Sequence, residues 1–209
     1  MPQSSIATAA QAVIARLEPL LSQRRGPILV ALDGPAGSGK STLASLLAAA
    51  LDATIVPSDD FYAAHIPTAE WQARRPRDRV ADGIDWRRMR REALEPLLAG
   101  KAAKWCAFDF NVGVRPDGTY PMQVTPTERQ PARVVILDGA YSTRPELADL
   151  ITLSVLVDAP VAVRHARMAA RDAPDFLAAW HALWDDAEAY YFTIVRPQTS
   201  FDLVVSMSE

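Results

Sequence analysis

The sequence predicts a three-layer α/β fold, in which about five parallel strands are covered on both faces by helices. Two observations predict it. Short, continuous apolar runs recur along the chain, and such runs are typical of strands that are buried on both faces of a parallel sheet. Segments with apolar residues at helical spacing lie between most of these runs, and this alternation indicates right-handed crossover connections.

The elements follow one another from the start of the chain. Apolar residues at Ala9, Val13 and Leu17 predict a first helix over 6–21, which a Gly-Pro pair near residue 26 ends. The strands are expected at 28–32, 54–56, 133–137, 153–157 and 202–205. The further helices are expected at 40–51, 86–99, 145–150, 161–171 and 176–192.

The expected helix at 86–99 carries its own start and stop signals. Asp85 stands where an N-cap is needed, and Gly100 follows the last apolar position. Its basic residues are expected to form a solvent-facing surface: Arg87, Arg88, Arg90 and Arg91.

Two segments do not fit the alternation of strands and helices. The stretch 104–127 has a strand-like pattern with a turn signal at 115–118, which predicts a small antiparallel hairpin beside the sheet. The polar, arginine-rich stretch 65–82 is expected to be a long loop.

Composition limits the classes of protein that this chain can be. Its 209 residues are expected to form one domain over 1–209. The single cysteine, Cys106, excludes an internal disulfide framework, and the net charge of -3 gives no general attraction to nucleic acid. No apolar run approaches the roughly 20 residues of a membrane span, and the first residues lack a signal-peptide pattern. A cytoplasmic protein without nucleic-acid or membrane partners is therefore expected.

A glycine-rich stretch at 34–42 carries the strongest chemical signal, because it satisfies the phosphate-binding pattern G-x-x-x-x-G-K-[ST]. Its glycines let the backbone wrap so that successive N–H groups point at phosphate oxygens, and the following helix adds its positive end. Lys40 would neutralise the β- and γ-phosphates, and the Ser41 hydroxyl would reach Mg²⁺. The residues expected to bind the nucleotide here are Gly34, Ala36, Gly37, Ser38, Gly39, Lys40, Ser41 and Thr42.

Carboxylates follow two of the expected strands. Asp59 and Asp60 come after the second strand and Asp138 after the third, and ligands of open α/β sheets bind at the carboxyl ends of strands. We expect Asp59 to accept a proton from an attacking hydroxyl and, with Ser41 and Asp138, to hold the metal. Asp60 is expected to cap a short helix or to face solvent.

Three arginines lie at spacings of three and four residues, which puts Arg164, Arg167 and Arg171 on one helix face. Guanidinium groups suit phosphoryl oxygens during transfer. We expect Arg167 to act in catalysis and the other two to bind the nucleotide; a merely solvated basic face is the alternative.

These motifs together resemble the uridine kinase family, within the uridine kinase/phosphoribulokinase group of P-loop kinases. The resemblance rests on the stretch 32–42, on Asp59-Asp60-Phe61-Tyr62, on Asp85-Trp86 and on Asp138-Gly139, in this order and spacing. It extends over about 27–197. The Asp-x-Phe-Tyr element and the late Val195-Arg196-Pro197 are its most specific parts.

The resemblance implies a P-loop NTPase fold and a kinase that uses ATP and Mg²⁺ to phosphorylate a hydroxyl of a small-molecule acceptor, a uridine- or cytidine-like nucleoside. It implies that Asp59 is the catalytic base and that Tyr62, Phe108 and Arg171 contact the acceptor. The segment 160–192 would form the lid and the C-terminal helices, and the excursion at 104–127 would cover the acceptor.

Two acceptor-reading elements of the family are missing here. The stretch 79–84 reads Arg-Val-Ala-Asp-Gly-Ile where the family has Asp-His-Pro, and no histidine stands near Phe108. Two other functions stay open: a nucleoside-monophosphate kinase, with Arg74, Arg75 or Arg79 holding the acceptor phosphate, and a regulatory ATP-binding protein without catalysis. Association into homo-oligomers is also left open.

Overall fold

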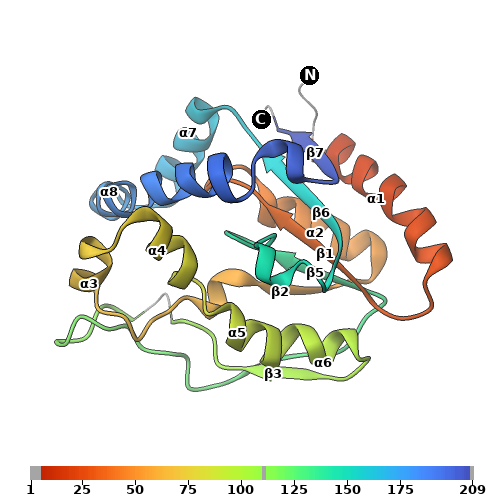
Figure 1. Cartoon of the computed structure of the whole chain (residues 1–209), viewed down its shortest axis with the longest axis horizontal. Coiled ribbons are helices and arrows are strands. Elements are labelled where there is room, and N and C mark those ends of the chain that lie inside the picture. Colours follow the sequence, from red (N-terminus) through yellow and green to blue (C-terminus); the bar gives the residue numbers. More distant parts are fainter. Residues whose placement is uncertain (1–5, 110–111, 208–209) are drawn as a thin grey trace.

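The computed structural model describes residues 6–109 and 112–207. Its centre is a five-stranded parallel sheet in the order β2-β5-β1-β6-β7, with helices on both sides (Figure 1). The strands are β1 (Ile28–Asp33), β2 (Thr54–Pro57), β5 (Val134–Asp138), β6 (Ile151–Asp158) and β7 (Leu203–Ser206). The predicted fold class is confirmed, and each expected strand forms within two residues of its expected limits.

The central strand β1 is buried along its whole length because both of its faces are covered. Its residues Val30 and Leu32 pack into the apolar cluster under α1 (Ile6–Gln23) and α2 (Lys40–Leu51). Its residue Leu29 packs into a second cluster on the opposite face. This double burial explains why β1 is a continuous apolar run and does not alternate.

The second face is covered mainly by the helical segment predicted at 86–99. It consists of α5 (Trp86–Met89), a π-helical stretch (Arg90–Leu94) and α6 (Glu95–Leu98). Pro96 has no N–H to donate to the carbonyl of Glu92 four residues earlier, and the wide turn lies at this point. The predicted cap is confirmed, because the Asp85 side chain accepts a hydrogen bond from the Arg88 backbone N–H at 3.0 Å.

The C-terminal helices lie side by side at one end of the sheet (Figure 1). Helix α7 (Val161–Arg171) has the predicted limits, and α8 (Pro174–Tyr190) continues into a π-helical stretch, Tyr191–Val195. Three short 3₁₀ segments occur along the described chain: Ser58–Phe61 after β2, Pro145–Leu147 after β5 and Gln198–Ser200 before β7. The helix expected at 145–150 is thus reduced to its first turn.

The prediction of a long loop at 65–82 is wrong. The chain there forms α3 (Thr68–Ala73) and α4 (Pro76–Asp82). Trp71 on α3 is fully buried, and Pro76 takes the first helical position of α4, where its missing N–H costs nothing. Both helices are short and each has one large apolar residue, Trp71 or Val80, which is too few for a periodic signal.

The predicted antiparallel excursion is present, but its strands are shorter than expected. Strand β3 (Ala103–Trp105) pairs with β4 (Thr127–Arg129), and an isolated bridge joins Phe108 to Met122. The predicted turn at 115–118 forms, with Gly118 at φ 82°. Most of the described residues between the two strands are irregular.

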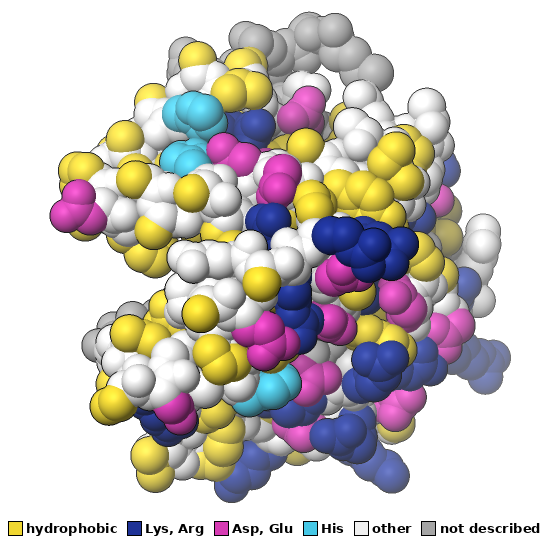
Figure 2. Space-filling view, turned by 60° about the vertical axis from the view of Figure 1, so that its left-hand side comes forward, with side chains coloured by type: hydrophobic (Ala, Val, Ile, Leu, Met, Phe, Trp, Pro, Cys, Tyr) yellow, Lys and Arg dark blue, Asp and Glu magenta, His cyan; other side chains and the backbone are white. Residues whose placement is uncertain are grey.

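Figure 2 brings forward the side on which α3, α4 and α8 lie. A hollow opens there between the part that carries α7 and α8 and the part around α3, and acidic and basic side chains are interspersed over this face. Within the described ranges, none of the helices has both the length and the apolar character that a membrane crossing requires.

Candidate functional site

The glycine-rich stretch forms a loop between β1 and α2 that only glycine permits at several positions. Gly34, Gly37 and Gly39 all have positive φ angles, of 151°, 75° and 100°. A Cβ atom on Gly34 would lie 2.1 Å from the Val157 carbonyl oxygen, and one on Gly37 would lie 2.6 Å from the carbonyl oxygen of Arg164. The loop therefore has the tight wrapping that a phosphate cradle needs, at the N-terminus of a 12-residue helix.

Asp33 fastens the start of this loop and was not singled out from the sequence. Its fully buried carboxylate accepts hydrogen bonds from the Gly34 N–H, from the N–H and hydroxyl of Thr143 and from the Tyr191 hydroxyl, at 2.7–2.9 Å. A charged residue at the end of an otherwise apolar strand was the available signal, because buried carboxylates need such partners.

Lys40 folds back over the loop. Its Nζ donates to the carbonyl oxygens of Gly34 and Pro35, at 2.7 and 3.0 Å. Ser41 and Thr42 lie exposed in the first turn of α2, whereas Ser38 is buried. The expected nucleotide-binding residues thus come together around one short stretch of backbone.

The predicted carboxylates lie at the same edge of the sheet as the loop. Pro57 pairs with Asp138, and Asp138 pairs with Leu32, so the ends of β2, β5 and β1 are neighbours. The segments approach closely: a Cβ on Gly139 would lie 2.1 Å from the Ser58 hydroxyl oxygen. Asp59 follows directly after this contact.

The charges of Asp59, Asp138 and Lys40 act on one another. Asp59 is accessible to solvent, but protein groups crowd around it, and this loss of solvation raises the pKa of its carboxyl. Lys40 lowers the same pKa, and Asp138 raises it. Burial also raises the pKa of Asp138, against the opposing effects of the Ser41 hydroxyl and Lys40.

These residues fit a divalent cation. Oδ1 of Asp138 is buried without a hydrogen-bond partner, and the Asp59 side chain has none among the residues that the structure describes. In the same part of the chain no three acidic, histidine or cysteine side chains cluster as a full ligand set. Such a sparse oxygen set suits Mg²⁺, which keeps several waters and takes further ligands from phosphates.

Asp60 has a different environment from Asp59. Its Oδ2 accepts a hydrogen bond from Trp105 Nε1 at 2.8 Å, and its backbone oxygen accepts from Arg88 at 3.1 Å. The expectation that Arg88 faces solvent is therefore wrong. Its guanidinium is half-buried, lies 4.6 Å from the centre of the Phe61 ring and ties this segment to the excursion at Cys106.

The three arginines of α7 meet the loop differently. Arg167 donates to the carbonyl oxygens of Gly37 and Ser38, at 3.1 and 3.2 Å. Arg171 pairs with Asp172 and lies close enough to Asp59 that each affects the pKa of the other. Arg164 lies against the loop and pairs with Glu188, a residue that was not singled out from the sequence.

Aromatic rings gather around Tyr62, three residues after Asp59. Tyr62 and Phe108, both predicted on the acceptor side, contact each other with ring centres 5.0 Å apart. Three more rings surround Tyr62 at 6.1–6.3 Å, contributed by Trp71, Tyr120 and Trp184. The sequence indicated only two members of this cluster. Trp71 lies on α3, where a loop was expected, whereas Tyr120 and Trp184 lie in predicted segments whose packing against Tyr62 the local pattern does not contain.

The basic residues that could have held an acceptor phosphate are paired with acids. Arg79 is buried and bonded to Asp186 and the Leu183 carbonyl. Arg74 pairs with Glu70 and Asp82, and Arg75 with Asp78.

Comparison with known proteins agrees with this geometry. The family model for cytidylate kinase matches residues 30–81, a stretch that contains the loop and Asp59. A search of curated proteins gives no significant match.

Among solved structures, a candidate fructose transport system kinase from Silicibacter sp. TM1040 is similar, with a TM-score of 0.67 and 27% identity over 96% of this chain and 98% of that one. A candidate uridine kinase from Bacillus stearothermophilus has a TM-score of 0.63 and 16% identity, over 93% and 99% of the two chains. The expected resemblance to P-loop kinases is confirmed at the level of the fold, and phosphotransferase chemistry is supported in general terms.

Proposed function

We propose that this protein is a kinase that transfers the γ-phosphoryl group of ATP to a hydroxyl group of a small, neutral acceptor. One observation carries the proposal. Asp59 and Asp138 interact electrostatically with each other and with Lys40, beside a glycine loop that has the shape of a phosphate cradle. Positioning and charge stabilisation are what phosphoryl transfer requires of a protein.

The residues divide the chemistry between them. Lys40 neutralises the β- and γ-phosphates, and Asp59 accepts the proton of the attacking hydroxyl as the new P–O bond forms. Arg167 and Arg171 approach from α7, where their charges stabilise the transferred group. Ser41, Asp138 and Asp59 would hold Mg²⁺, which when bound orients the phosphates and offsets their charge.

The acceptor side favours a neutral molecule. Arg74, Arg75 and Arg79 are each paired with a carboxylate, so they give no evident support to a nucleoside-monophosphate kinase. The rings around Tyr62 can instead pack against a flat face of a base or sugar. A uridine- or cytidine-like nucleoside is the first candidate that we propose.

A sugar is the second candidate, and the similarity to the candidate fructose transport system kinase over nearly the whole of both chains favours it. Aromatic rings and nearby carboxylates suit the apolar faces and hydroxyls of sugars as well as those of nucleosides.

The deciding experiment is a screen for ADP formation with Mg²⁺, ATP and panels of ribonucleosides, deoxynucleosides, sugars and nucleoside monophosphates, with a Lys40→Ala variant as control. We expect turnover with one neutral class and none in the variant. Turnover only with monophosphates would move the assignment to a nucleoside-monophosphate kinase. ATP binding without turnover on any acceptor would favour a regulatory protein.

A further inference from the structure

Glu188 reaches the phosphate loop from α8, and Arg164 reaches it from α7. Oε2 of Glu188 accepts a hydrogen bond from the Ala36 N–H at 2.7 Å. Nη1 of Arg164 donates to Oε1 of Glu188 at 3.0 Å and to the Ala36 carbonyl oxygen at 3.3 Å. Both polar backbone atoms of Ala36 are therefore engaged by one ion pair that joins two helices.

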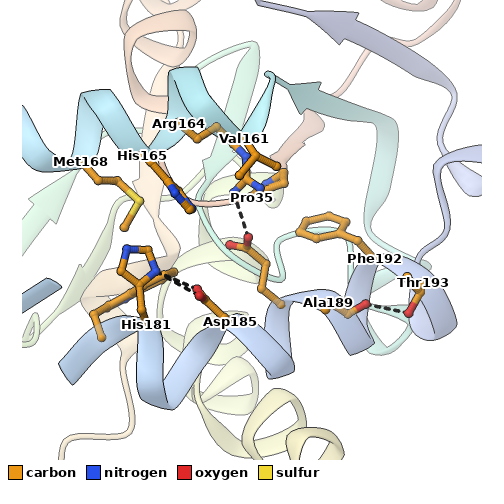
Figure 3. A pocket seen from close by; sticks show the side chains of 12 residues that line it. Pro35, Val161, Arg164, His165, Met168, His181, Asp185, Ala189, Phe192 and Thr193 are labelled. Carbon is orange, nitrogen blue, oxygen red and sulfur yellow. Dashed lines mark hydrogen bonds and ion pairs between the residues drawn. The ribbon is translucent and has the colours of Figure 1, made fainter. Parts of the chain in front are cut away.

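This ion pair is well enclosed. The side chains of Arg164 and Glu188 are only 14% and 18% exposed, so the pair is more than a surface contact. The backbone of α7 also packs closely against the loop, since a Cβ on Gly37 would lie 2.6 Å from the Arg164 carbonyl oxygen. Figure 3 shows Arg164 and Pro35 at one side of a pocket of about 340 Å³ between α7 and α8, which Glu188 also lines.

The geometry points to a positioning role: Glu188 and Arg164 form a brace that holds the Ala36 peptide in place and so sets the shape of the phosphate loop. In this role Arg164 acts through the loop, and under the proposed function direct contact with the nucleotide falls to Arg167 and Arg171. The inference rests on the proposed function, because it concerns how the ATP site of that kinase is held.

The direction of the change in ATP affinity distinguishes the brace from a simple effect of charge. ATP is an anion, so removing a nearby carboxylate should by charge alone strengthen its binding. If Glu188 holds the loop, the same change should weaken binding, because the Ala36 peptide loses its charged acceptor and Arg164 its partner. The rival is that Arg164 donates directly to a phosphate oxygen, for which its buried Nε, without a partner among the described residues, is available.

The test is equilibrium binding of Mg·ATP to Glu188→Gln, with Asp185→Asn as the matched control. Asp185 lies on the same helix, is exposed and pairs with His181. We expect Glu188→Gln to weaken ATP binding about tenfold, the scale of one charge-assisted hydrogen bond, and the control to bind as the wild type does. Unchanged or tighter binding in Glu188→Gln would overturn the brace.

Two further variants, the Arg164→Met/Glu188→Met double variant and Glu188→Met alone, show whether weak binding results from misfolding. Arg164→Met combined with Glu188→Met removes both charges together and leaves no unpaired ion. The brace predicts that the double variant binds ATP about as weakly as either single variant, because both act through one contact. If Arg164 touches phosphate directly, Glu188→Met alone should bind ATP normally and only variants that lack Arg164 should be weak.

Turnover separates a brace from a general loss of structure. In Glu188→Gln the KM for ATP should rise while the KM for the acceptor stays unchanged, whereas a partly unfolded enzyme would keep both KM values and lose only active molecules. Wild-type protein that binds ATP without turnover refutes the proposed kinase and leaves the binding test of the brace intact. Wild-type protein that binds no nucleotide overturns both.

Discussion

The hydroxyl of Tyr191 donates a hydrogen bond to Oδ2 of Asp33 at 2.8 Å. This bond joins the end of α8 to the residue that directly precedes the phosphate loop. Both residues are fully buried, and Tyr191 lies where α8 widens into a π-helical stretch. Burial and the nearby Asp33 charge raise the pKa of the Tyr191 hydroxyl, so it remains a proton donor at any ordinary pH. The loop is thus anchored to the helix that also carries Glu188.

We expect Tyr191→Phe to destabilise the fold by about 1–3 kcal/mol, because a buried carboxylate loses one of its donors. For a protein of this size that corresponds to a melting temperature lower by roughly 2–4 °C for each kcal/mol. Thermal unfolding measures it, with Tyr190→Phe as the control at the neighbouring, partly exposed position. Equal melting temperatures for the two variants would show that the Asp33 contact adds nothing.

The Lys40→Ala variant tests whether the phosphate loop acts in turnover without contributing much to the stability of the fold. Lys40 is partly exposed, and in the described structure its side chain donates hydrogen bonds only to carbonyl oxygens of the loop, so its loss should change the melting temperature much less than it changes turnover. Turnover should collapse, because the β- and γ-phosphates lose their cation. Lys101→Ala is the matched control, since this lysine is exposed beyond α6. Near-normal turnover in Lys40→Ala would remove the loop from the mechanism.

The sequence was enough to predict the sheet and the carboxyl edge at which the site lies. Buried parallel strands have to be apolar throughout, and the glycine pattern 34–42 has few uses other than holding phosphate. The strand ends then bring Asp59 and Asp138 to the loop.

The helices α3 and α4 and the contacts of α8 could not be predicted in the same way. Short polar helices carry no periodic signal, and Arg79 became buried only because Asp186, far along the chain, lies opposite it. Glu188 similarly reads as a surface residue of an amphipathic helix until α8 is packed against the loop. Such pairings depend on the tertiary arrangement, which local pattern does not contain.

Asp138→Asn should stabilise the metal-free protein at neutral pH. Burial raises the pKa of Asp138, so the folded protein holds the proton of this carboxyl more tightly than the unfolded chain does. The stability of the wild type is therefore lost as pH rises from the ordinary aspartate range through the raised value, while the variant stays uncharged. The gain in melting temperature of the variant should grow as the pH rises above the ordinary aspartate range, about pH 4.

Mg²⁺ with ADP should reverse this ranking, because the ligands stabilise the wild type and find a weaker site in Asp138→Asn. Asp149→Asn is the control, since exposed Asp149 has its pKa lowered by Arg90 and should show no gain at neutral pH. A gain for Asp138→Asn that does not depend on pH would exclude the buried charge as its cause.

Asp59→Asn tests the step on which the assignment as a hydroxyl kinase depends. The acceptor hydroxyl must lose its proton as it meets the γ-phosphorus. A carboxylate within reach is basic enough to take this proton, because the loose transition state transfers it late. Asparagine keeps the shape of Asp59 but removes its charge and basicity. We expect kcat to fall by roughly 10²–10⁴, while ATP binding stays measurable because the loop is untouched.

Asp60→Asn is the matched comparison, and the structure explains why its effect should be much milder. Oδ2 of Asp60 accepts a hydrogen bond from Trp105, which an asparagine carbonyl can also accept. Asp59 has no such partner among the described residues. The charges of Lys40 and Asp138 shift the pKa of Asp59, whereas the pKa of Asp60 responds to other groups. Steady-state turnover and ATP binding on both variants decide the matter. The reverse ranking would make Asp60 the base, and normal turnover in both would mean that neither carboxylate takes the proton.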